Sequence, residues 1–186
     1  NKSEVSIVDE SGKVHYYGSL LEALEDAKES ESPVTIIVES DTDAKVNLAD
    51  QTDKTVTIPE NVTIVIPQDS NLVIGDGTEL KVDGKIENNG IIENSGVITP
   101  GSADRIQNET QNAEIINKNE VHWMIGADDT IYYGSLKDAL AVAAEAGLTA
   151  EKQMNVYLDQ DLTILDNVEI PEGVNLMIPA DKTLTI

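Results

Sequence analysis

Cysteine and phenylalanine are absent from the 186 residues, and Arg105 is the single arginine. Without cysteine, the chain has no disulfides, thiolate metal sites or cysteine nucleophiles. Aromatic residues make up only 3% of the sequence, which leaves few rings for stacking on bases. Lys and Arg number 12 against 35 Asp and Glu, so the net charge is −23 and the chain repels phosphate backbones. We therefore expect no nucleic-acid partner.

Long apolar runs are also missing. No stretch approaches the roughly 18 apolar residues of a membrane span, so we expect no direct membrane insertion. No basic, apolar signal segment follows Asn1, and the chain ends at Ile186 within an alternation of apolar residues. We therefore expect a soluble, already trimmed piece of a longer protein.

Two stretches of the sequence recur. Residues 16–20, Tyr-Tyr-Gly-Ser-Leu, return as residues 132–136. Residues 56–74 align without gaps on residues 168–186, with the same residue at 10 of 19 positions. Such repetition indicates two copies of one module. The predicted organisation is a first module over 1–101, a polar connector over 102–118 and a second module over 119–186, which stops before the counterpart of 75–101.

Each module opens with a predicted β-hairpin followed by a short helix. In the first module, alternating residues flank the turn-like segment 9–12, which is typical of a hairpin. The helix that follows has a one-sided apolar stripe and the spacing of an N-terminal capping box, as does its counterpart in the second module. The predicted capping pairs are Ser19 with Glu22 and Ser135 with Asp138. Helices this short are marginal alone, so we expect each to cover an end of a core.

Very short aliphatic strands with regular spacing follow the first helix. The steps are eight residues over 64–82 and six residues over 86–98. Recurrent short strands and turns predict a β-solenoid, in which each coil stacks on the last. The predicted core ladder is Ile86, Ile92 and Ile98, with turns at Gly84, Gly90 and Gly96. Asn88 and Asn94 are expected at corresponding corners, where asparagine tolerates left-handed backbone and can hydrogen-bond its neighbours.

A local alternative is a hairpin across Asn89-Gly90, the preferred dipeptide of a tight two-residue turn. That alternative would make the chain a set of antiparallel α+β repeats. The solenoid also explains Gly84, Gly96 and the three isoleucines. The predicted fold class is therefore mainly β, with short parallel β-helix segments that each follow a hairpin and a capping helix.

The order of these motifs resembles repeat-bearing, adhesin-like surface proteins of Gram-positive bacteria with the right-handed parallel β-helix, or pectin-lyase-like, fold. The matching stretches are YGSLLEALEDA, VTIIV, IPENVTIVIP, LVIGDGTELKVDG and KIENNGIIENSGVI. The resemblance implies a secreted or cell-surface bacterial protein whose helix plugs the open end of the strands. The second helix signal departs from the usual form and favours two short solenoid pieces.

Catalytic chemistry finds little support in the sequence. Lyases that resemble this family use acids, calcium and a basic residue on one sheet face, whereas Arg105 lies in the polar connector. Among 35 acids many carboxylate pairs for glycoside hydrolysis can be drawn, so no pair is informative. His15 and His122 occupy non-equivalent positions in the two copies, and we interpret them as solvated hairpin residues. We expect no enzymatic activity.

The sequence offers two weak ligand signals. Carboxylates suited to calcium occur at Asp41 and Asp43, at Asp50 and Asp53, within residues 75–77, and at Asp128 and Asp129. Turn chemistry accounts for the same residues without an ion, so no cofactor is expected. Tyr17 and Tyr133 are candidates for stacking on a sugar, although packing of one tyrosine of each pair on the cap helix explains them as well.

The expected function is a non-catalytic extracellular repeat module that serves as a stalk, a scaffold or an adhesin surface. A carbohydrate-binding module is the alternative, followed by a polysaccharide lyase or hydrolase. The expected partner is a host or cell-wall glycan or protein.

Overall fold

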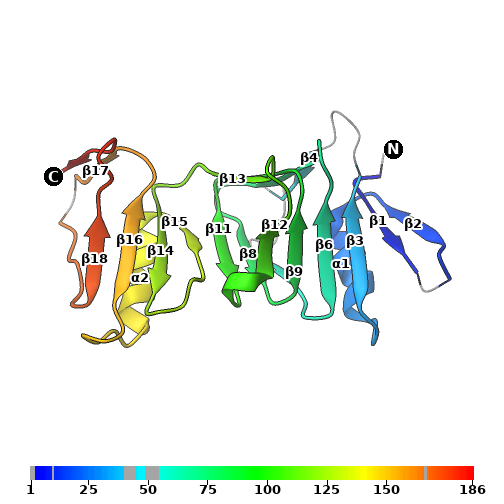
Figure 1. Cartoon of the computed structure of the whole chain (residues 1–186), viewed down its shortest axis with the longest axis horizontal. Coiled ribbons are helices and arrows are strands. Elements are labelled where there is room, and N and C mark those ends of the chain that lie inside the picture. Colours follow the sequence, from blue (N-terminus) through cyan, green and yellow to red (C-terminus); the bar gives the residue numbers. More distant parts are fainter. Residues whose placement is uncertain (1–2, 10, 40–44, 49–54, 166) are drawn as a thin grey trace.

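The computed structural model describes residues 3–9, 11–39, 45–48, 55–165 and 167–186. It confirms the predicted fold class: the chain is mainly β, with about six turns of parallel β-solenoid and two α-helices among the described residues. The strands cross the long axis of an elongated molecule, whose two termini lie at opposite ends (Figure 1). Among the described residues, no helix is both long and apolar enough to span a membrane.

The first repeat begins with the predicted hairpin and helix. The hairpin strands are antiparallel, and β1 also pairs with the first solenoid strand, β3. The helix buries its apolar stripe, Leu20, Ala23, Leu24 and Ala27, in the first core. The elements are β1 (Val5–Val8), β2 (Val14–Tyr17), α1 (Leu20–Lys28) and β3 (Val34–Val38).

The solenoid of the first repeat has three faces. We call them the first, second and third faces, after the sheets that contain β3, β4 and β5. On each face, a strand pairs in parallel with the strand of the same face in the preceding coil. The remaining strands are β4 (Lys45–Asn47), β5 (Thr55–Ile58), β6 (Val62–Ile66), β7 (Asn71–Ile74), β8 (Glu79–Val82), β9 (Lys85–Asn88), β10 (Ile91–Asn94) and β11 (Val97–Pro100). Because β9 and β10 belong to different sheets, the alternative hairpin across Asn89-Gly90 does not form.

The three isoleucines spaced by six form a ring inside one coil. Ile86, Ile92 and Ile98 are each fully buried, and they lie on the first, second and third faces respectively. The ladders run between coils instead: Ile86 stacks between Ile64 and Ile106. A step of six therefore carries the chain round one corner, and after two such steps a step of eight, from Ile98 to Ile106, completes the coil. The predicted ladder is thus a ring, because sequence spacing does not distinguish a new face from a new coil.

The glycines with the same six-residue spacing lie where one coil passes directly over the turn of the coil before it. A Cβ atom on Gly90 would come within 2.2 Å of the Ser70 carbonyl oxygen and 2.5 Å of the Pro67 carbonyl oxygen. Gly84 and Gly96 would make equivalent contacts of 2.2 Å with backbone oxygens. Side-chain-free corners therefore set the close stacking of the coils.

Asn88 and Asn94 also lie at corresponding places, but not in left-handed backbone. Asp69 is the only non-glycine residue with positive φ in the described chain. Both asparagines are fully buried, and the side-chain oxygen of each accepts a hydrogen bond from the amide two residues later, on Gly90 and Gly96, at 3.1 Å. The expected hydrogen bond to a neighbouring residue therefore forms at both corners, without the left-handed backbone.

Residues 102–118, predicted as a polar connector, are built into the first solenoid. Ile106 pairs with Ile86, and Ile115 pairs with Ile92, so the segment adds one strand to the first face and one to the second. Its elements are the 3-10 turn η1 (Ala103–Arg105), β12 (Ile106–Asn108) and β13 (Glu114–Asn117).

The second repeat extends the sheet of the third face. Its core, however, lies on the opposite side of that sheet from the first core. Its elements are β14 (Val121–Ile125), β15 (Tyr132–Gly134), α2 (Leu136–Glu145), β16 (Met154–Leu158), β17 (Leu162–Thr163), β18 (Val174–Met177) and β19 (Leu184–Thr185). Together β18, β16, β14, β15, β11, β8 and β5 form one seven-stranded sheet. Ile98 faces the first core, whereas Trp123 and Val156, on the opposite side of the sheet, face the second core beneath α2.

Candidate functional site

A change of hairpin register between the repeats sends equivalent tyrosines to different places. In the first repeat Val5 pairs with Tyr17, whereas its counterpart Val121 pairs with Gly134, one residue further on. Since side chains alternate along a strand, a one-residue slip exchanges the two sides of the sheet. Tyr17 therefore packs on its own repeat's core, while Tyr133 packs on the core of the preceding repeat.

Tyr17 lines a surface cavity of about 550 Å³ between the hairpin and the C-terminal end of α1. His15 lies on the same side of the hairpin, and its Nε2 is 2.8 Å from Asp9 Oδ2. Asp9 also accepts hydrogen bonds from Ser11 and from the Lys13 amide. The hydrogen bonds from Ser11 and His15 lower the pKa of the Asp9 carboxyl. The cavity therefore holds a tyrosine beside a fixed histidine–aspartate pair.

Tyr133 lies in a groove where the two repeats meet, which we call the junction groove. The groove consists of two adjoining cavities of about 470 and 160 Å³. Both cavities are lined by Ile115, Ile131 and Tyr133. The groove forms here because the first and second faces end at β12 and β13 while the third face runs on into the second repeat.

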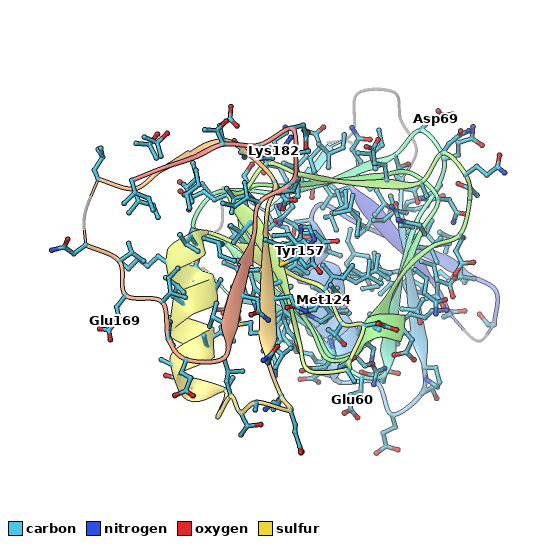
Figure 2. All side chains as sticks on the ribbon, turned by 60° about the vertical axis from the view of Figure 1, so that its left-hand side comes forward. Glu60, Asp69, Met124, Tyr157, Glu169 and Lys182 are labelled. Atoms are coloured by element: carbon cyan, nitrogen blue, oxygen red, sulfur yellow. The ribbon has the colours of Figure 1, made fainter. Side chains whose placement is uncertain are left out.

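A second histidine–aspartate pair lies in the junction groove. His122 Nδ1 is 2.8 Å from Asp159 Oδ1, and Asn117 Nδ2 donates to Asp159 Oδ2 at 2.6 Å. The imidazole stacks on the ring of Tyr157, labelled in Figure 2, with ring centroids 5.0 Å apart and planes 6° apart. Tyr133 is the other aromatic neighbour, with a centroid distance of 6.2 Å from His122.

The hydroxyl groups of both tyrosines lie in a negative electrostatic potential from nearby carboxylates. Burial raises the pKa of the Tyr133 hydroxyl, and the charge of Asp159 raises it further. Burial also raises the pKa of Tyr17, followed by its hydrogen bond to Asp26 and the charge of that carboxylate. Each site therefore disfavours a second negative charge at the tyrosine oxygen.

The two predicted stacking residues, Tyr17 and Tyr133, thus each border a cavity with a histidine–aspartate pair. Sequence reasoning missed these pairs because His15 and His122 occupy non-equivalent positions. The residues of the junction pair are also 37 positions apart, and their contact depends on β14 pairing with β16. The available signal was that each histidine lies on the same side of its hairpin as the tyrosine. Which residues share a side, however, depends on the pairing register of the two hairpin strands.

The predicted capping residues lie at the helix N-termini. Ser19 Oγ accepts from the Glu22 amide at 3.2 Å, while the Glu22 carboxylate accepts from the Gly18 amide at 3.1 Å. Ser135 and Asp138 form a reciprocal box, with the Asp138 amide donating to Ser135 Oγ and the Ser135 amide donating to Asp138 Oδ2. These residues belong to the scaffold and not to either cavity.

The residues named for calcium are scattered. Asp41, Asp43, Asp50 and Asp53 lie outside the described residues. Asp76 is exposed, Asp129 lies at the junction groove, and Asp128 Oδ1 accepts from the amide and hydroxyl of Thr130 in a turn. Within the part of the chain that the structure describes, no three His, Cys, Asp or Glu side chains gather around a metal-sized site.

Arg105 lies in η1 and donates to the Gly84 carbonyl oxygen at 3.5 Å. It lines neither the Tyr17 cavity nor the junction groove. Several other charged side chains lie at the rim of the molecule, as Glu60, Asp69 and Glu169 do in Figure 2.

Comparison of the chain with protein-family models, with curated proteins and with solved structures gave no match to any of them.

Proposed function

We propose that the chain is a non-catalytic scaffold module of a bacterial cell-surface or secreted protein, of the adhesin-like kind found in Gram-positive bacteria. The observation that supports this most is the stacking of parallel coils through close backbone contacts at Gly84, Gly90 and Gly96. In a solenoid each coil contacts only its neighbours, so length grows by repetition and the product is a stiff rod. The resemblance of the motifs to surface proteins supports the location.

If the chain forms a stiff rod, it should be an elongated particle in solution. Small-angle scattering of the purified chain should give the profile of a stiff, extended body, and an antibody against the chain should stain intact source cells. A flexible-chain scattering profile would refute the scaffold. Staining that appears only after the cells are permeabilised would refute the location. Release of reducing ends or unsaturated products from polysaccharides would refute the absence of catalysis.

Carbohydrate binding is a second proposed function, supported by the cavities at Tyr17 and Tyr133. Each combines an aromatic ring with carboxylates and a polarised histidine, and sugars are bound by ring packing and by hydrogen bonds to such groups. Binding on a glycan array should weaken when Tyr133 or Tyr17 is replaced by Ala. Silence of the unmodified chain across plant, host and bacterial glycans would refute this role without affecting the scaffold.

A further inference from the structure

The outer side of the first hairpin exposes apolar side chains. Val8, Val14 and Tyr16 alternate with the residues that pack on the first core, so they lie on the side of the hairpin that faces away from it. All three are exposed, and Tyr16 is 64% exposed. Among the described strands, β2 is also the last of its sheet. A free strand edge beside an apolar surface is able to pair with another strand.

The second repeat shows what the equivalent surface contacts. Its hairpin strand β15 pairs antiparallel with β11, and Tyr133 packs on the first core opposite Ile98. Tyr133 is also paired with His122 inside its own hairpin. The repeat counterpart of His122 is Ser6, which pairs with Tyr16. The register slip therefore puts Tyr16 in the structural place of Tyr133.

The last strands of the two repeats lie in the same order. In the first repeat, β11 on the third face is followed by β12 on the first face and β13 on the second. In the second repeat, residues 167–170 are the counterpart of the third-face strand β5, and they are followed by β18 and β19, the counterparts of β6 and β7. At the junction of the repeats, β15 adds to the third face at this point. Residues 167–170 therefore offer the place that β11 offers there.

Residues 167–170 expose apolar side chains that are buried in the first repeat. Val168 and Ile170 are 41% and 44% exposed, whereas their counterparts Val56 and Ile58 are buried. Among the described residues, this segment pairs with no strand. It lies in the C-terminal part of the elongated molecule, at the opposite end from β1 and β2 (Figure 1). The two ends of the chain thus carry the two surfaces that meet at the junction.

The ladder of the third face gives the register of a contact between these surfaces. Val56 and Ile98 pair with the same residue of β8, so Val168, the counterpart of Val56, takes the place of Ile98. Since Tyr16 takes the place of Tyr133, the antiparallel pairing of the junction brings Tyr16 opposite Val168.

The neighbouring pairs in this register are compatible. Two residues further along the antiparallel strands, Val14 comes opposite Ile170, and both side chains are apolar and exposed. Between these pairs His15 comes opposite Glu169, so no two carboxylates face each other. The contact would cover the apolar side chains of both ends.

We propose that copies of this chain join head to tail, with β2 of one copy paired with residues 167–170 of another. The partner is a second copy because the chain already contains this contact, between its own repeats. Such an interface is heterologous: it joins two different surfaces and leaves one of each free, so further copies can add. The inference goes beyond the proposed scaffold function and depends neither on the location of the protein nor on carbohydrate binding.

Light scattering coupled to size-exclusion chromatography tests the self-association of the whole chain. We expect the mean mass to rise with protein concentration and to pass beyond that of a dimer. Each copy carries a net charge of −23, so association should strengthen as salt screens the repulsion. A chain that stays monomeric at every concentration, in high salt as well as low, would overturn the proposal.

Two blocking variants identify the surfaces that meet. Tyr16→Asp and Val168→Asp each place a carboxylate at an exposed position, so each should keep the circular dichroism spectrum and weaken self-association at least about tenfold. An equal mixture of the two should form dimers and nothing larger, because each variant keeps one intact surface of the opposite kind. Val142→Asp, at an exposed residue of α2, is the matched control and should associate as the unmodified chain does. Undiminished association of either blocking variant alone would overturn the proposal.

Crosslinking tests the register independently. After mild oxidation, a mixture of the Tyr16→Cys and Val168→Cys chains should give a disulfide between the two copies, detected by mass spectrometry of proteolytic fragments. Asp76→Cys, at an exposed residue between β7 and β8, replaces Val168→Cys as the control and should give none. Crosslinks of Val168→Cys chains mainly to one another would show that like ends meet, and would overturn the head-to-tail contact.

Discussion

Ile98 and Tyr133 are paired directly across the boundary between the two repeats, on antiparallel strands β11 and β15. Ile98 is fully buried at the third face, and Tyr133 lies on the same side of the sheet, over the end of the first core. This pairing joins the repeats into one sheet. It also places a tyrosine of the second repeat where the first solenoid would otherwise expose its apolar end.

Truncation of an inward isoleucine tests the ring inside one coil. Ile92→Ala removes a fully buried side chain and should lower the free energy of unfolding by about 2–5 kcal/mol, as large-to-small core substitutions do. Val14→Ala, at a residue 40% exposed, should cost no more than about 0.5 kcal/mol. Urea unfolding followed by circular dichroism measures both. Equal effects of the two substitutions would show that Ile92 does not face a core.

The close passage of coils at Gly90 makes a second prediction. Gly90→Ala places a Cβ atom 2.2 Å from a backbone oxygen of the preceding coil, so the backbone has to shift, and stability should fall by about 1–3 kcal/mol or more. Gly18→Ala is the control, because the nearest atom to its Cβ is the Glu22 carboxylate oxygen at 3.4 Å. Thermal unfolding compares the variants. A Gly90→Ala chain as stable as Gly18→Ala would contradict the stacking.

The hydrogen bonds of the buried Asn88 side chain should contribute to the free energy of unfolding. Asn88→Ala removes hydrogen bonds from Asn88 Nδ2 to Asn108 Oδ1 at 2.8 Å and to the Glu114 carbonyl oxygen at 3.2 Å. It also leaves the Gly90 amide without its side-chain acceptor. Unpaired buried groups should cost about 1–3 kcal/mol. Asn175→Ala, at an exposed residue, should be nearly neutral in the same unfolding assay, and a comparable loss there would argue against a special role for Asn88.

Tyr133 should make the chain sensitive to alkali. Its pKa is raised above the ordinary value of 10.0, so the folded state holds the proton more tightly than the unfolded state. That contribution to stability is present below about pH 10 and is lost as the pH rises through the folded pKa. Unfolding curves between pH 8 and about 11.5 should therefore show a smaller decline for Tyr133→Phe than for the unmodified chain. An identical decline would mean that Tyr133 titrates as it does in water.

Local patterns predicted the elements of this fold well. Alternation in β1 and β2, the one-sided stripe at Leu20 and Leu24, and the short aliphatic strands are periodic features that do not depend on distant residues. The antiparallel pairing of β11 with β15 has no such local signature, and neither does the one-residue register slip that separates Tyr133 from Tyr17.

The candidate site was accordingly predicted only in part. Tyr133 was identified as a ligand-stacking candidate from its repeat, but the groove around it depends on contacts between residues far apart in the chain. Asp159 follows β16 and approaches His122 only because β14 and β16 pair antiparallel. Physical contact at that range follows from strand order, which residue spacing alone does not specify.

Successive coils of the solenoid stack in parallel register. Because the chain has no cysteine, an introduced pair tests it without interference. Val65 and Glu87 are partners on neighbouring strands β6 and β9, at a spacing of about 5 Å that a disulfide can bridge. Glu93, on a different face, serves as the control partner for Val65.

The decisive measurement is mass spectrometry of proteolytic fragments after mild oxidation of Val65→Cys/Glu87→Cys and of Val65→Cys/Glu93→Cys. We expect an intrachain crosslink between positions 65 and 87, with the far-ultraviolet circular dichroism spectrum unchanged, and none between 65 and 93. A crosslink that forms equally in both variants, or only between 65 and 93, would contradict the stacked coils.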